Sequence, residues 1–213
     1  MVIAQPAVSL TDFALFIEST VFAALLWRGR AVFAHLQVWF VVFFLSLALA
    51  ALAGGISHGF LEHRHPALDA LVWSVTLLAI GLTGLSTWFI GAGLLDESWL
   101  TRAIAVLASL LFVLYVAVVL FVDTRFLVAV LYYLPATLFL LLLLLWRFID
   151  TGHFWIFPGI SGLVLAVAAA AVQQSGLTLH PVWLDHNVLY HLIQAAAMLL
   201  FFLFARHITR YRG

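Results

Sequence analysis

The chain has 213 residues, of which 66% are hydrophobic and 8% are charged, and its formal net charge is zero. Because soluble domains usually carry about 25% charged residues and the mean hydropathy here is +1.20, the composition excludes a soluble globular protein and predicts an integral membrane protein. The lack of a basic stripe argues against nucleic acid as a partner, and the lack of cysteine and lysine excludes thiolate metal sites, disulfides and a retinal Schiff base.

Apolar runs of about 20 residues recur along the chain, and each is long enough for a helix to cross a lipid bilayer. Backbone polar groups in lipid must be hydrogen bonded within their own segment, so these runs are predicted to be helices. We expect an all-α fold, a single domain over residues 1–213 that forms a bundle of seven transmembrane helices. The expected spans are residues 10–27, 33–60, 67–94, 99–122, 126–146, 153–174 and 184–205.

The first run is expected to be a spanning helix rather than a signal peptide, because no basic region precedes it. The arginines predict the orientation, because cytoplasmic loops collect basic residues. With the N-terminus outside, Arg64 and Arg125 lie on the outer side. The inner side then holds the other arginines, at positions 28, 30, 102, 147, 206, 210 and 212. We therefore expect the N-terminus outside and the C-terminus inside.

Ionisable side chains lie near the outer ends of four spans, and such residues are costly in a membrane and by default indicate function. The second span ends near Ser57 and His58, and the third carries Asp69 in its first turn. Glu18 lies about two turns into the first span from the same side. The seventh span begins with Asp185, His186, Asn187, Tyr190 and His191. The sequence therefore predicts one shared site near the outer face.

His58 is flanked by Gly54, Gly55 and Gly59, which would let a second backbone or a ligand approach closely. A histidine that binds a metal usually has its second ring nitrogen held by a carboxylate or a carbonyl. Asp69 is the nearest candidate across the short turn. The alternative is that His58 caps the second helix while Asp69 stabilises the positive N-terminal end of the third.

His186 and His191 are five residues apart, which on a regular helix places them about 140° apart, so spacing alone does not make them ligands of one ion. Asn187 lies four residues before His191 and on its face. If Asp185 is the N-cap, His186 begins the helix and its side chain can still turn toward the bundle axis. The alternative is a helix cap with an interfacial histidine.

The chain resembles the alkaline ceramidase and adiponectin-receptor superfamily of seven-helix, zinc-dependent membrane hydrolases at three places. These are His58, Asp69 and the aromatic-His-Leu sequence Tyr190-His191-Leu192. The family places one zinc-binding histidine near the end of its second helix, an aspartate at the start of the third, and a His-x-x-x-His pair in the seventh. The eleven-residue separation of His58 and Asp69 is similar to that of ceramidases, and Glu18 resembles an acidic residue of the first helix. The resemblance implies a divergent prokaryotic member in a bacterial inner membrane.

The chain departs from this family at two positions. The first histidine of the seventh-helix pair falls at Asn187, so the third ligand is neighbouring His186 or Asn187 itself. The family's serine, four residues before the first zinc-binding histidine, falls at Gly54, with Ser57 as the nearby replacement.

The expected function is a zinc-dependent intramembrane hydrolase that cleaves an amide or ester bond of a membrane lipid. Zinc would be held by His58, His186 and His191, with Asn187 or Asp185 as a substitute or supporting partner. Three nitrogen ligands and one water form a catalytic zinc site, in which the metal lowers the pKa of the water to about 7.

Four further side chains have expected roles around the metal. Asp69 is expected to orient a ligand or to act as the base, and Ser57 or Tyr190 to assist an oxyanion. Glu18 either pairs with the metal-bound water or a histidine, or is protonated and hydrogen bonded inside the bundle.

Two other functions fit the same residues. In a non-enzymatic membrane sensor or transporter, the polar cluster would bind a lipid or small molecule or relay protons. In a haem protein, two histidines from different helices would supply the axial ligands.

Overall fold

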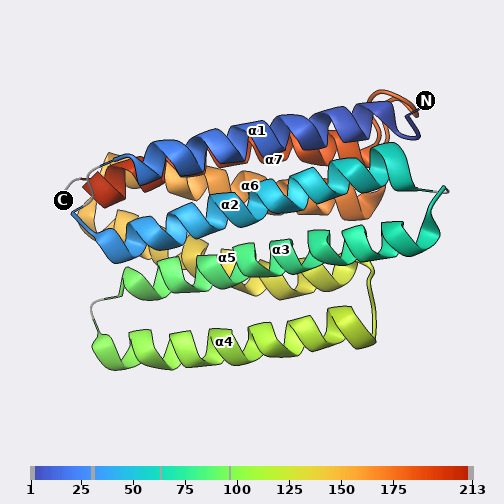
Figure 1. The fold of residues 1–213 in the computed structure, drawn as a ribbon. Coiled ribbons are helices and arrows are strands. Elements are labelled where there is room, and N and C mark those ends of the chain that lie inside the picture. The colour runs from blue at the N-terminus through green and yellow to red at the C-terminus, as the bar shows by residue number, and fades with distance from the viewer. Residues whose placement is uncertain (1–2, 30–31, 63, 96, 211–213) are drawn as a thin grey trace.

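The computed structural model describes residues 3–29, 32–62, 64–95 and 97–210, and this part of the chain forms a bundle of seven long helices (Figure 1). All of them are long and apolar enough to cross a membrane, which confirms the predicted all-α class. The elements are α1 (Pro6–Trp27), α2 (Ala34–Ile56), the π-helical turn η1 (Ser57–Leu61), α3 (Pro66–Gly93), α4 (Ser98–Phe121), α5 (Phe126–Thr151), the 3₁₀ turn η2 (Phe154–Ile156), α6 (Phe157–Ser175) and α7 (His186–Arg210).

The helix ends follow local signals in the sequence. α1 begins at Pro6, ahead of the expected residue 10, because proline is well suited to a first helical turn, where its missing N–H is not needed. α5 continues past residue 146 to Thr151 and ends at Gly152, whose φ of 68° is the left-handed conformation that glycine adopts easily. Arg147 therefore does not end α5; its guanidinium donates to the carbonyl of Leu94.

α1 lies along both α2 and α7, whereas α4 lies at the edge of the bundle beside α3 (Figure 1). The described ends of the chain lie at opposite ends of the bundle (Figure 1). The half of the bundle that holds the end of α7 is packed with aromatic rings. Phe40 and Phe44 of α2 and Phe201 and Phe204 of α7 are at most 1% exposed there, and the rings of Phe40 and Phe201 are 5.5 Å apart.

The opposite half contains a close contact between α1 and α2. The Ser9 hydroxyl donates to the carbonyl of Gly55 over 2.8 Å, and a Cβ atom on Gly59 would lie 2.5 Å from that hydroxyl oxygen. The amides of Ala4 and Gln5 donate to carbonyls of η1 at 3.1 Å. The glycines beside His58 therefore leave room for side chains of α1 and for the backbone that leads into it, as small residues do between membrane helices.

Candidate functional site

A cavity of about 200 Å³ opens in the half of the bundle that holds η1 and the start of α7. Six helices, α1, α2, α3, α5, α6 and α7, contribute to its wall together with η1. Its deeper side is apolar and includes Leu15, Leu47 and Ile80, whereas its other side is polar and aromatic. The polar and aromatic side chains are Asp12, His58, Trp73, Thr76, Phe126, Gln173, His186, Asn187, Tyr190, His191 and Gln194.

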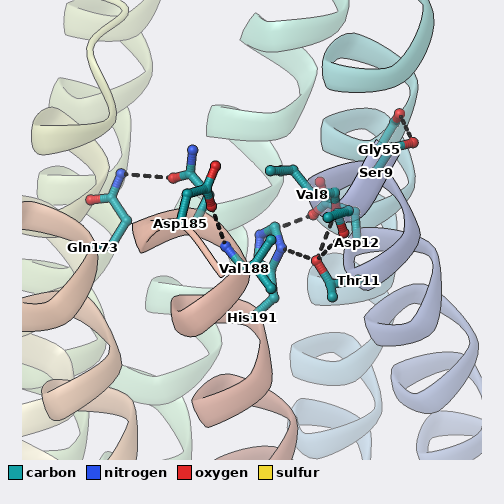
Figure 2. A network of polar contacts seen from close by, with 11 residues as sticks. Val8, Ser9, Thr11, Asp12, Gly55, Gln173, Asp185, Val188 and His191 are labelled. Carbon is teal, nitrogen blue, oxygen red and sulfur yellow. Dashed lines mark hydrogen bonds and ion pairs between the residues drawn. The ribbon is translucent and has the colours of Figure 1, made fainter. Parts of the chain in front are cut away.

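His191 is held from α1 at both of its ring nitrogens (Figure 2). Nδ1 lies 2.8 Å from the hydroxyl oxygen of Thr11, and Nε2 lies 3.2 Å from Oδ1 of Asp12. The Thr11 hydroxyl is also within 3.0 Å of two carbonyls of its own helix, those of Ala7 and Val8. The imidazole thus bridges α7 and α1 at a buried position.

Asp12 is the residue that the sequence interpretation missed. Its side chain is buried, with only 4% of the residue exposed, and its Oδ2 has no hydrogen-bond partner among the described residues. A buried polar atom without a partner costs free energy. The signal was present in the sequence, because Asp12 falls inside the first apolar run, where an ionisable residue indicates function.

Gly54 makes room for this carboxylate. A Cβ atom at position 54 would lie 3.3 Å from Oδ1 and 3.4 Å from Oδ2 of Asp12. Position 54 is the place where the ceramidase-like pattern calls for a serine. In this chain the space beside α2 is instead occupied by an acidic group that comes from α1.

The predicted pairing of His58 with Asp69 is not what the structure contains. The Ser57 hydroxyl donates to Oδ1 of Asp69 over 2.5 Å, and the carboxylate in contact with Nδ1 of His58 is that of Glu62, at 4.0 Å. The His58 ring packs edge-on against Trp73, with the ring centroids 5.7 Å apart. Of Ser57, His58 and Asp69, only His58 is among the described residues that line the cavity.

The start of α7 has the predicted cap. Oδ1 of Asp185 accepts the amide N–H of Val188 over 2.9 Å (Figure 2), so Asp185 caps the helix that His186 begins. Both His186 and Asn187 then line the cavity, and Oδ1 of Asn187 lies 3.5 Å from the amide nitrogen of Gln173. His186 and Asn187, the two alternatives for the predicted third zinc ligand, therefore face the same cavity.

Glu18 lies outside this cavity. It lines a separate groove of about 250 Å³ between α1 and α7, together with Thr11, His191 and Leu192. Its Oε2 is buried and has no hydrogen-bond partner in the described ranges. The expectation that Glu18 shares one cavity with the histidines is therefore wrong. Among the described residues, Glu18 and the histidines are linked only through His191, which lines both the cavity and the groove.

The predicted zinc ligands are not arranged around one common point. His58, His186 and His191 all line the cavity, but each ring nitrogen of His191 already lies against an α1 side chain. Across residues 3–29, 32–62, 64–95 and 97–210, no three His, Asp or Glu side chains are grouped closely enough to hold a metal ion. A catalytic zinc takes three protein ligands, so this arrangement fits zinc only if His191 moves away from α1.

Comparison with known proteins gives a family but no activity. No curated protein and no solved structure matches the chain significantly, and the resemblance to ceramidases and adiponectin receptors stays a prediction. One family model matches residues 7–210, nearly the whole sequence. The chain belongs to this family, DUF6962, a family of unknown function.

Proposed function

We propose that this protein binds an amphiphilic lipid inside the membrane, with the lipid's polar group in the cavity beside His191 and its chain deeper in the bundle. The observation that carries the proposal is a second, mainly apolar cavity of about 50 Å³ that adjoins the first. The two cavities share Leu47, Ile80, Tyr190 and Gln194 in their walls. Polar and apolar spaces in contact match the two parts of an amphiphile.

The chemistry of the two walls supports this assignment. Ligand sites are mostly apolar, with a few polar groups that fix orientation, and each buried CH₂ group of a chain contributes about 0.8 kcal/mol. The inner cavity is lined by Phe43, Leu163, Met198 and Phe201, whereas the outer one offers imidazole, amide and carboxyl groups. Polar side chains are costly in a membrane-spanning bundle, and a polar ligand would offset that cost.

The orientation and the location are part of the proposal. The arginine distribution supports an N-terminus outside and a C-terminus inside. In that orientation the cavity beside η1 lies near the outer face. In the bacterial inner membrane that we propose, this is the periplasmic face.

The test uses a substitution that fills the chain cavity. Ala166 lines the inner cavity and is 9% exposed, so Ala166→Leu should exclude the chain and lower the amount of lipid that copurifies, as measured by native mass spectrometry. Ala168→Leu, on an exposed position of the same helix, is the matched control and should leave bound lipid unchanged. Wild-type protein without bound lipid, or equal lipid occupancy in all three proteins, would contradict the proposal.

Zinc-dependent hydrolysis of an amide or ester lipid is the second candidate. The observation that favours it is that His58, His186, His191 and Asp12 line one cavity. Metal analysis of the purified protein tests it. One zinc per chain that is lost in His191→Ala, together with release of fatty acid from ceramide or another acyl lipid, supports hydrolysis. Metal-free protein that binds lipid without cleaving it rejects hydrolysis, and a Soret band would identify haem instead.

A further inference from the structure

The oxygen of Asp12 that lacks a partner gives information about the ligand. We propose that the bound lipid presents a hydrogen-bond donor, a hydroxyl group or an amide or amine N–H, to Oδ2 of Asp12. The inference rests on the proposed lipid-binding function and names the chemistry of the polar group. It makes Asp12 the residue that determines specificity in the cavity.

Asp12 is the one carboxylate among the described residues that line the cavity. Its Oδ1 is engaged by His191 at 3.2 Å, whereas Oδ2 is buried and has no hydrogen-bond partner in the described part of the chain. Since leaving a buried acceptor unpaired is costly, a ligand that supplies a donor there gains a contact that the protein alone does not make.

The proton between Asp12 and His191 decides whether Oδ2 donates or accepts hydrogen bonds. A proton between Oδ1 of Asp12 and Nε2 of His191 is bonded to one atom and hydrogen bonded to the other. A proton on Oδ2 would instead be a buried donor with no acceptor among the described residues. If the proton sits on Nε2, the carboxylate is ionised; if it sits on Oδ1, Oδ2 is a carbonyl oxygen. In both cases Oδ2 only accepts hydrogen bonds.

The other polar groups of the cavity do not discriminate between ligands with and without a hydrogen-bond donor. Gln173, Asn187 and Gln194 carry amides, and an amide both donates and accepts. The imidazole rings of His58 and His186 also carry nitrogens that can donate to a ligand. Asp12 is therefore the group that favours binding of a lipid with a hydrogen-bond donor over an uncharged lipid without one. It also disfavours a fatty-acid carboxylate, because a carboxylate only accepts hydrogen bonds.

The experiment compares two uncharged probes of the same chain length, a primary fatty amide and the corresponding fatty methyl ester. The amide has N–H donors and the ester has none. A hydrogen bond to a buried carboxylate predicts that the detergent-purified wild-type protein binds the amide about tenfold or more tightly than the ester. In Asp12→Asn the side chain can donate as well as accept, so the preference should fall to nearly equal affinities.

A second pair of variants keeps Asp12 in place. In Gly54→Ser the new hydroxyl would lie beside the carboxylate and could supply the missing donor, while Gly54→Ala adds the same Cβ atom without a hydroxyl. The preference for the amide should be smaller in Gly54→Ser than in Gly54→Ala. This comparison stands even if Asp12→Asn does not fold.

The outcomes separate this inference from the lipid-binding proposal. If the wild-type protein binds neither probe, lipid binding itself is wrong. If it binds both with equal affinity, or if Asp12→Asn keeps the full preference for the amide, lipid binding stands and the role of Asp12 is overturned.

Discussion

The two halves of the bundle use the same helices for opposite purposes. Near the end of α7, Phe201 and Phe204 interlock with Phe40 and Phe44 of α2, and these rings are at most 1% exposed. At the other end of α7, His191 meets Asp12 of α1, beside a cavity. Aromatic packing supports the helices in the first half, which also holds a cavity of about 290 Å³ beside Arg147. The second half holds the cavity lined by titratable side chains, and there Oδ2 of Asp12 and Oε2 of Glu18 have no hydrogen-bond partner among the described residues. The proposed function therefore places the lipid's polar group and the interlocked rings at different ends of the same helices.

The largest expected effect lies in the aromatic half. Phe40→Ala removes a fully buried ring that contacts Phe201 and Phe204 and lines neither of the two adjoining cavities. The lost van der Waals contacts should lower the free energy of unfolding by about 3–5 kcal/mol, measured by denaturation in detergent. Leu199→Ala, at a position 47% exposed, is the control and should cost far less. Equal effects for the two variants would contradict a division between a supporting half and a functional half.

A smaller effect is expected for the coupling of Asp12 and His191. A double-mutant cycle with Asp12→Asn and His191→Gln should give an interaction free energy of about 1–3 kcal/mol, because the two side chains are in contact and buried. The same unfolding assay measures it. Asp12→Asn combined with Thr209→Val, at the opposite end of α7, provides the comparison and should be additive. Additivity in both cycles would show that His191 and Asp12 do not act as a pair.

The smallest expected effect concerns the cap of α7. Asp185→Ala removes the acceptor for the amide of Val188 and should lower the free energy of unfolding by about 1 kcal/mol. It should also weaken lipid binding, because His186 and Asn187 line the cavity from the first turn. Asp185→Asn keeps a capping oxygen and should behave almost as the wild type. If lipid binding falls as much in Asp185→Asn as in Asp185→Ala, Asp185 has a role beyond capping.

Local chemistry explains why parts of the site were predictable. The cap at Asp185 depends on residues a few positions apart, so the sequence predicts it and the structure confirms it. The gathering of His58, His186 and His191 at one cavity also agrees with the expectation that their spans end at the same face. The pairing of Asp69 was predicted incorrectly, because the π-helical turn η1 brings the Ser57 hydroxyl to that carboxylate.

Sequence alone determined the all-α fold and the approximate spans, because a membrane requires long apolar segments whose backbone groups are satisfied within each helix. It also determined that polar residues inside those spans need partners. Only the tertiary structure decided which partners they have. Asp12 and His191 are far apart in the chain, and they meet because Ser9, Gly55 and Gly59 let α1 approach α2 while α1 also lies against α7. Such contacts depend on how several helices pack together, which the pattern within any one helix does not encode.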